Sequence, residues 1–346
     1  MPATTPRPAS FYVSLPKVDL HRHLEGSLRL RTMLEVGRAL GMDLPGTSQL
    51  RDLVQIGPTE PFTFVNFLSK FQTLRLFYRS PEIIERITRE AIADAAADNV
   101  RYLELRFTPV ALGRAESFPL RDVIDWVVQA SQAASAELGI KTRLIASVNR
   151  HESPELAAQV ARLAAERITD GLIGLDLAGN EADFSALLFS DVIKEARQAG
   201  LYITLHAGEW GGAGNVSEAI AQLGAQRIGH GVRVLEDPQA TLLARERQIP
   251  FEVCITSNYQ SGVVPAQNAH PLARMLALGL NVTINTDDPS ISQICLSDEY
   301  RRACEELGLS LSQLKSCVLA AARAAFLPDD EKAALVSELE AGFPAR

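Results

Sequence analysis

The sequence predicts an α/β fold, a (β/α)8 TIM barrel, from three observations. Eight short β-rich runs follow one another along the chain, amphipathic helical stretches separate them, and 346 residues is a size at which such barrels form one unit. We therefore expect a single domain over residues 1–346. The alternative for this pattern is an open, doubly wound parallel sheet.

The predicted strands are short and rich in Val, Ile and Leu. They are expected at Lys17–Leu24, Val100–Phe107, Thr142–Val148, Leu172–Leu177, Leu201–His206, Arg227–His230, Phe251–Thr256 and Asn281–Asn285. Helices are expected at Pro81–Ala97, Leu120–Leu138, Pro154–Ile168, Phe184–Ala199, Val216–Leu223, Pro238–Arg247, Pro271–Leu278 and from Ser310 onward. The helix after Ser80 has the clearest start, because Pro81 suits the first helical position, where no N–H is needed.

One interval departs from this alternation. About 75 residues separate the first two predicted strands, far more than a βα connection usually needs. Helices are expected in this interval near Arg29–Leu40 and Thr63–Tyr78. We predict that residues 27–98 form a helical insertion over the barrel mouth that contributes to a lid on the pocket. The alternative is a peripheral subdomain that supports the barrel.

Composition and charge exclude several classes of protein. Lys and Arg total 34 against 42 for Asp and Glu, a net charge of −8, and there is no basic tract, so nucleic-acid binding is not expected. No apolar run approaches the ~20 residues of a membrane helix. Residues Met1–Pro8 lack the apolar region of a signal peptide. The cysteines show no CxxC spacing, which favours a cytoplasmic location with inert thiols; they are Cys254, Cys295, Cys304 and Cys317.

A histidine pair ends the first predicted strand, which reads His21-Arg22-His23 and is followed by Glu25. Residues i and i+2 share one face of a strand, so both imidazoles are expected to point into the barrel and Arg22 outward. Barrel enzymes build their sites at the carboxyl ends of the strands. Because packing alone hardly explains two inward histidines there, the pair indicates a metal site.

Further polar residues end later strands. His206-Ala-Gly-Glu209 ends the fifth, His230 ends the sixth, and Asp287 and Asp288 follow the eighth. Three histidines and one Asp from strands one, five and eight can converge on the barrel axis, and imidazole with carboxylate suits Zn²⁺. His230 is near enough to be a ligand or a base, and spacing does not decide between them. The fourth strand carries no Lys that could bridge two ions, so one metal is favoured.

Several polar residues give weaker signals. The glycine-rich stretch 208–214 lacks the G-x-G-x-x-G order, so a tight turn is favoured over a phosphate cradle. His151 and His270 are expected to be surface or capping residues. Glu104 and Asp176 lie in mid-strand, where they could orient metal ligands or make buried structural hydrogen bonds. The signature of cytidine-type deaminases, His-x-Glu with Pro-Cys-x-x-Cys, is missing.

Six motifs follow one another between residue 17 and about residue 290. They are Leu20–Gly26 (LHRHLEG), Asp176–Glu181 (DLAGNE), His206–Glu209 (HAGE), Arg227–Gly231 (RIGHG), Glu252–Asn258 (EVCITSN) and Thr286–Pro289 (TDDP). In type and order they resemble the motifs of the adenosine/adenine deaminase family of metal-dependent hydrolases. One such motif would be a weak signal, but the ordered set is specific.

This resemblance implies a zinc-dependent hydrolytic deaminase of purine metabolism on a distorted (β/α)8 barrel, with one Zn²⁺ per subunit. The implied zinc ligands are His21, His23, His206 and Asp287. Glu209 would donate a proton to the purine N1, and His230 would take the proton from the attacking water. Asp288 would contact the nucleophile and the N7 side of the ring.

The resemblance also implies substrate-binding residues. His23 would border the substrate, Glu25 would lie toward the ribose, the backbone N–H of Gly179 would meet N3, and Asp288 would face the purine. Elementary chemistry agrees with this scheme, because zinc lowers the pKa of bound water to about 7. Attack at C6 requires N1 to gain a proton, so Glu209 must be protonated when it acts, which burial favours.

The implied reaction converts adenosine and 2′-deoxyadenosine to inosine and deoxyinosine with release of ammonia, as in purine salvage. Glu25 stands where adenosine deaminases often carry Asp and adenine-specific relatives more often carry Glu. The segment 257–263 is nearer to the nucleoside-acting branch, although Ile255 replaces a common proline. The alternatives are deamination of another 6-aminopurine (adenine, an N6-substituted AMP or aminodeoxyfutalosine) and a non-catalytic purine-binding protein.

Overall fold

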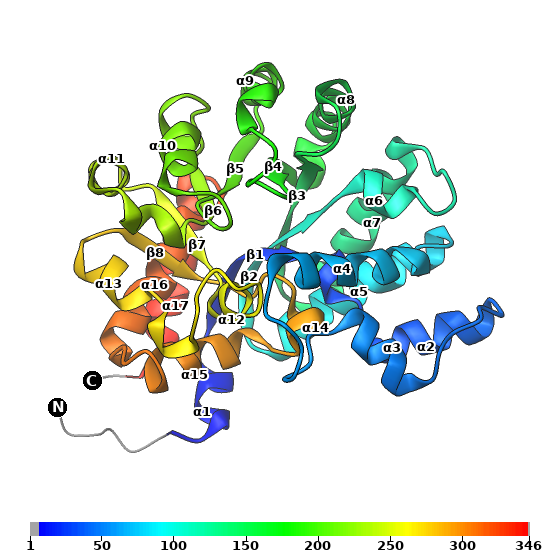
Figure 1. Cartoon of the computed structure of the whole chain (residues 1–346), viewed down its shortest axis with the longest axis horizontal. Coiled ribbons are helices and arrows are strands. Elements are labelled where there is room, and N and C mark those ends of the chain that lie inside the picture. The colour runs from blue at the N-terminus through cyan, green and yellow to red at the C-terminus, as the bar shows by residue number, and fades with distance from the viewer. Residues whose placement is uncertain (1–6, 345–346) are drawn as a thin grey trace.

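The computed structural model describes residues 7–344, and at its centre lies one eight-stranded sheet (Figure 1). Each strand pairs in parallel with the next in chain order, which confirms the predicted (β/α)8 barrel. The strands are β1 (Lys17–His23), β2 (Val100–Phe107), β3 (Lys141–Asn149), β4 (Leu172–Ala178), β5 (Tyr202–Ala207), β6 (Arg227–His230), β7 (Pro250–Val253) and β8 (Asn281–Ile284).

The seam between β8 and β1 explains why the barrel is distorted. The two strands meet in an isolated parallel bridge between Arg22 and Asp287, at the carboxyl end of the barrel. Deeper in the seam, the side-chain Oδ1 of Asn285 accepts the backbone N–H of Leu20 at 2.9 Å, where a closed ladder would use a backbone carbonyl. The seam is therefore tightest at the mouth, next to the predicted metal ligands.

Helices surround the sheet, and two of them have the predicted bounds. The outer ring comprises α5 (Pro81–Ala97), α7 (Leu120–Leu138), α8 (Pro154–Ala165), α9 (Ser190–Gln198), α10 (Ala213–Ala221), α11 (Pro238–Glu246), α13 (Leu272–Ala277) and α16 (Leu311–Ala324). Ser80 caps α5 by accepting the N–H of Ile83 at 3.3 Å, with Pro81 at the first helical position. After α16, α17 (Asp329–Gly342) ends the described chain.

The segment after β7 differs from the prediction. The strand predicted over Phe251–Thr256 ends at Val253, and Ile255–Gln260 forms the helix α12. A buried carboxylate causes this change, because Glu299 accepts the backbone N–H of Thr256 at 3.1 Å and so caps α12. Tertiary contact thus overrides the β preference of the Ile-Thr pair.

The prediction also lacked four short helices. They are α1 (Ala9–Ser14), α6 (Pro109–Gly113), α14 (Pro289–Ser292) and α15 (Leu296–Glu305), the helix that carries Glu299.

Most of the extra helical material lies between β1 and β2. It comprises η1 (Glu25–Ser27), α2 (Leu30–Ala39), α3 (Thr47–Val54), α4 (Phe64–Leu74), η2 (Arg75–Phe77) and α5. The prediction did not include α3. In Figure 1, α4 passes in front of β1 and β2, whereas α2 and α3 lie to one side. Helix α5 packs on β2 and α7 like the other outer helices, so the additional layer consists of α2 to α4.

Within residues 7–344, no helix combines the length and apolar character needed to cross a membrane. Residues 1–6 of the segment predicted not to be a signal peptide lie outside the described residues. All four cysteines are free, as expected, with Cys254 and Cys317 buried and Cys295 and Cys304 half-buried.

Candidate metal centre and active site

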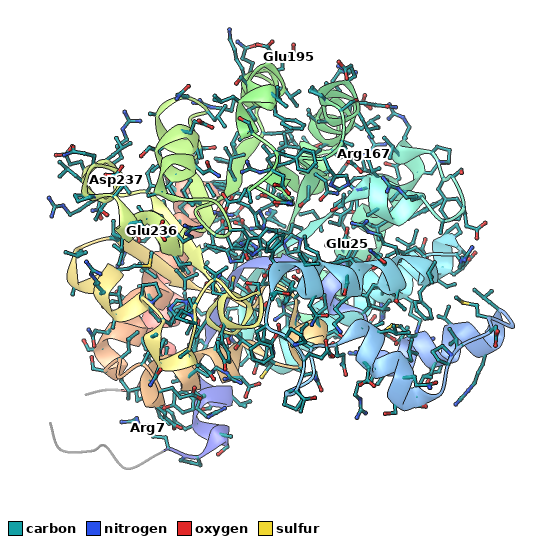
Figure 2. All side chains as sticks on the ribbon, in the orientation of Figure 1. Arg7, Glu25, Arg167, Glu195, Glu236 and Asp237 are labelled. Atoms are coloured by element: carbon teal, nitrogen blue, oxygen red, sulfur yellow. The ribbon has the colours of Figure 1, made fainter. Side chains whose placement is uncertain are left out.

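A cavity opens at the carboxyl ends of the strands, where the sequence places its candidate residues. Predicted residues on its wall are His23, Glu25, Gly179, His206, Glu209, His230, Asp287 and Asp288. Helix α4 contributes Phe67, Leu68 and Phe71, and further unpredicted lining residues include Arg75, Thr108, Asn149 and Trp210. In Figure 2, Glu25 lies near the centre of the view, whereas Glu195 and Asp237 mark the outer helices.

Nitrogen and oxygen ligand atoms meet at the base of this cavity. One ligand atom from each of His21, His206, His230 and Asp287 lies within 4.8 Å of the other three, and all four residues are buried. The Nε2 atom of His21 is 3.2 Å from Asp287 Oδ1, and that of His23 is 3.4 Å from the same oxygen. Five predicted residues from β1, β5, β6 and the end of β8 therefore converge, although they are distant in sequence.

Two of these residues have a backbone conformation that is rare for residues with a side chain. His230 has φ of 58° and Asp287 has φ of 67°, in the left-handed region that side-chain-bearing residues rarely adopt. Such conformations persist where the surroundings hold them, and they concentrate at functional sites. Gly229 gives the imidazoles room, since a Cβ there would lie 3.0 Å from His21 Cε1. The strand ends are thus shaped to bring His230 and Asp287 into the cluster.

Carboxylates stand behind two of the histidines. Glu252 on β7 accepts from His21 Nδ1 at 2.8 Å, and Asp176 on β4 accepts from His206 Nδ1 at 3.0 Å. Each contact places hydrogen on Nδ1 and leaves the Nε2 lone pair free for a metal. Asp176 was one of two candidates for this orienting position, whereas Glu252 had not been assigned one. Its signals in the sequence were a charge within a short apolar strand and its place at the start of the Glu252–Asn258 motif.

Arginines in the barrel interior keep these carboxylates ionised. Burial alone would raise the pKa of Glu252, but Arg106 and Arg227 beside it hold that pKa well below its usual range. Arg106 Nη2 is 2.8 Å from Glu252 Oε2, and Arg227 Nε is 2.6 Å from Glu252 Oε1. Burial likewise raises the pKa of Asp176, and its contacts with His206 and Arg106 more than reverse that effect.

Glu104, the other mid-strand candidate, is not next to the histidines. Its carboxylate pairs with Arg227 and accepts the backbone N–H of Phe326 at 2.7 Å. Tyr102 also donates to it, at 2.8 Å. These contacts make Glu104 a structural residue of the barrel interior.

Glu209 has the opposite electrostatic setting to Glu252. Burial raises the pKa of Glu209 well above its usual range, and the nearby charges of Asp287 and Glu181 raise it further. Glu209 Oε2 lies 3.6 Å from His230 Nε2. The carboxylate of Glu181 accepts the backbone N–H of Gly208 at 2.9 Å and also that of Glu209, which fixes the turn. These surroundings favour the protonated form of Glu209.

Asp288 and Glu25 form a second group of buried carboxyls at the rim. Burial raises the pKa of Asp288 well above its usual range, and Asp287 and Glu25 add to that rise. Asp288 Oδ1 is buried without a hydrogen-bond partner, and so is Glu25 Oε2. Gly26 makes room for this pair, since a Cβ there would lie 1.8 Å from Asp288 Oδ1. Both residues thus present unpaired oxygens at the site.

The two remaining histidines have different surroundings. His151 is exposed and does not line the cavity. His270 is buried, and its Nε2 lies 3.3 Å from the Oδ1 of Asn258, whose Nδ2 lies 3.1 Å from His230 Nδ1. His270 is therefore connected to the site through one amide, which sequence reasoning missed because Asn258 was not recognised as a contact of His230.

Comparison with known proteins gives a consistent result. A family model described as adenosine deaminase matches residues 16–342. The adenosine deaminase of Klebsiella pneumoniae (strain 342) is 38% identical over 333 residues, which are 95% of this chain and 99% of that protein. The structure of an adenine deaminase from Arthrobacter aurescens superposes with a TM-score of 0.87 at 28% identity, covering 94% of this chain and 98% of its own. An amidohydrolase from Burkholderia ambifaria with bound zinc gives 0.86 at 28% identity, with coverages of 96% and 93%.

Proposed function

This chain belongs to the adenosine deaminase family, and we propose that it converts adenosine and 2′-deoxyadenosine to inosine and deoxyinosine with release of ammonia. The observation that carries the proposal is a protonatable carboxyl, Glu209, placed 3.6 Å from His230 beside a buried His and Asp cluster. Hydrolysis at C6 of a 6-aminopurine needs both a nucleophile and an acid for N1 at one site.

We propose that His21, His23, His206 and Asp287 hold a single Zn²⁺. The donor set fits, since His21 Nε2 is buried with no hydrogen-bond partner and imidazole with carboxylate is a zinc-binding combination. When bound there, the ion would supply a water whose pKa is lowered to about 7. Orienting carboxylates behind His21 and His206 support the assignment, because ligating histidines commonly donate their other N–H to such groups.

Side chains and one backbone N–H of this chain are proposed to contact the purine. Glu209 gives its proton to N1, which makes C6 more electrophilic, and ammonia leaves from C6 after water has added. Asp288, with its unpartnered Oδ1, faces the nucleophile and N7. The backbone N–H of Gly179, which follows β4 with φ of 92°, meets N3. His23 borders the substrate, and Glu25 lies toward the ribose.

We propose that the α4 part of the predicted insertion, residues 27–98, acts as a lid. Phe67, Leu68 and Phe71 of α4 line the cavity opposite the polar strand ends. An apolar wall of this kind excludes water from the reacting groups, which strengthens the electrostatic interactions within. The arrangement of α2 and α3 to one side fits the alternative role, support of the barrel.

A cytoplasmic location agrees with the four free cysteines, since exported proteins of this kind more often carry disulfides. The net charge of −8 and a cavity at the barrel mouth with titratable side chains in its wall favour a small-molecule partner over nucleic acid or membrane.

Relative rates on a set of 6-aminopurines test the proposed substrate. The purified, zinc-loaded protein should convert adenosine and 2′-deoxyadenosine faster than adenine or N6-methyl-AMP, as followed by ultraviolet absorbance and by ammonia release. Adenine is the second candidate, because an adenine deaminase shares the fold and Glu25 replaces the Asp expected for adenosine. A tenfold or greater preference for adenine would overturn the adenosine assignment, and no ammonia from any of these compounds would contradict an enzymatic role.

A further inference from the structure

We propose that Asn258 and His270 fix His230 in the tautomer that carries its hydrogen on Nε2. In this form His230 is a hydrogen-bond donor to the reacting groups, and it is neither a metal ligand nor the base that deprotonates water. The tautomer follows from the structure alone, whereas its consequence for turnover rests on the proposed deaminase function. Asn258 and His270 would then be positioning residues.

His270 lies on the side of Asn258 away from the cavity, and its own contacts fix its tautomer. The backbone N–H of Leu272 donates to His270 Nδ1 at 3.1 Å. A backbone amide can only donate, so Nδ1 must be the accepting, unprotonated nitrogen of that ring. A neutral imidazole carries one hydrogen, which therefore lies on Nε2. From there it points to Asn258 Oδ1 at 3.3 Å.

The tautomer of His270 in turn fixes the orientation of the Asn258 amide. With its oxygen facing His270, its Nδ2 faces His230 Nδ1 at 3.1 Å. An NH2 group can only donate, so His230 Nδ1 accepts and the ring hydrogen lies on Nε2. The reversed amide would require both nitrogens of His270 to accept, which a neutral imidazole cannot do. A cationic His230 would bring an Nδ1–H against the same NH2 group.

The hydrogen-bond partners at Nδ1 therefore divide three of the histidines, His21, His206 and His230, into two kinds. Carboxylates accept from Nδ1 of His21 and His206, so these rings direct Nε2 lone pairs toward the cluster. An amide donates to Nδ1 of His230, so this ring directs an N–H toward the same region. Metal binding and base catalysis both need a lone pair at Nε2, which His21 and His206 offer and His230 does not.

The surroundings of His230 Nε2 agree with a donor. Two carboxyl oxygens lie near it, Glu209 Oε2 at 3.6 Å and Asp287 Oδ2 at 3.9 Å. An N–H between these oxygens would orient an attacking oxygen through its lone pairs. Once Glu209 has given its proton to N1, its carboxylate can accept the proton that water releases when it bonds to C6.

Nitrogen NMR of the histidine rings reads the tautomer directly. The chain has six histidines, so ¹⁵N–¹H spectra of the full-length, zinc-loaded protein should resolve each ring, with a His230→Gln variant to assign the signal. We expect His230 to show an unprotonated Nδ1 and a protonated Nε2, and His21 and His206 to show protonated Nδ1 atoms. Hydrogen on Nδ1 of His230, alone or together with Nε2, would overturn the proposal. This measurement does not depend on the substrate.

An isosteric substitution tests whether the tautomer matters for turnover. In Asn258→Asp a carboxylate accepts from both rings, which moves the hydrogen of His230 to Nδ1. The expected result is a fall in kcat of about 10²- to 10⁴-fold, with KM for adenosine changed less than threefold. Asn281→Asp, at the start of β8, is the matched control and should keep normal kcat. A reversed tautomer with unchanged kcat would refute the functional part of the proposal.

His270 variants provide a second test if Asn258→Asp does not fold. His270→Gln can still donate to Asn258 and should preserve both the tautomer and kcat. His270→Ala frees the amide to rotate, so His230 should show a mixture of tautomers and kcat should fall by less than in Asn258→Asp. Equal tautomer populations and rates in the two variants would contradict the relay.

Discussion

Buried carboxyl groups occupy two layers of the barrel, and the groups that face them differ. In the interior layer, Glu252 and Asp176 lie against guanidinium or imidazole groups, and their pKa values are held low. At the rim, Glu209 and Asp288 lie near other carboxylates, and their pKa values are raised. Burial raises the pKa in every case, so the neighbouring charge decides which carboxyl is an ionised support and which carries a proton.

Asp287 is the exception at the rim. Burial would raise its pKa, but His230, His21 and His23 around it hold that pKa well below its usual range. Its neighbour Asp288 is equally buried and has the opposite shift. One step along the backbone thus separates a carboxylate suited to binding a cation from one suited to exchanging a proton.

The largest effect on metal binding and turnover is expected from removing the carboxylate of Asp287. Asp287→Ala deletes the carboxylate on which His21 and His23 converge, so the protein should lose zinc and with it all measurable turnover. Metal content after dialysis checks this, with Asp288→Ala as the matched control that should retain metal. Full zinc retention by Asp287→Ala would move the ligand assignment to other residues.

The next largest effect on turnover should come from a substitution of Glu209, the rim carboxyl that carries a proton. Glu209→Gln keeps the shape of the side chain but cannot transfer a proton, so kcat should fall by on the order of 10² or more. Zinc content and substrate affinity should remain near those of the unsubstituted protein. Steady-state kinetics with metal analysis provide the test, and near-normal kcat would refute the proton-donor role.

The interior layer is expected to affect stability and metal affinity more than chemistry. Glu252→Gln removes the charge shared by Arg106 and Arg227 and weakens the acceptor behind His21. Breaking such a buried pair costs about 3–5 kcal/mol, and loss of an orienting group lowers metal affinity about 10- to 100-fold. Urea unfolding and zinc titration measure the two effects.

Glu104→Gln is the control within the same layer. Glu104 shares Arg227 with Glu252 but has no contact with a candidate ligand. This variant should therefore lose stability while keeping its zinc affinity. Equal losses of zinc affinity in Glu104→Gln and Glu252→Gln would show that the effect comes from general destabilisation.

The division between the layers also explains what the sequence could predict. His21 and His23 could be placed on one face because strand periodicity dictates it, and strand ends converge on the barrel mouth whatever the loop lengths. The ion pairs of Arg106, Arg227 and Glu252 could not be predicted, because they depend on which side chains reach the same depth across the axis. The end of β7 was misjudged for a similar reason, since a distant carboxylate caps the helix that follows.

The smallest expected effect concerns folding stability and pH. Folded Glu209 keeps its proton at pH values where an unfolded Glu, with a pKa near 4.3, has released it. The folded state then binds more protons, so this residue makes stability fall as pH rises from about 4.3 to the raised pKa. Glu209→Gln removes this term, and the metal-free variant should gain stability over the unsubstituted protein by up to about 1.4 kcal/mol per pH unit in that window. Urea unfolding at pH 5 and pH 7 should give a larger difference at pH 7. A difference independent of pH would mean that Glu209 is ionised in the folded protein, which would remove it from the group of protonated rim carboxyls.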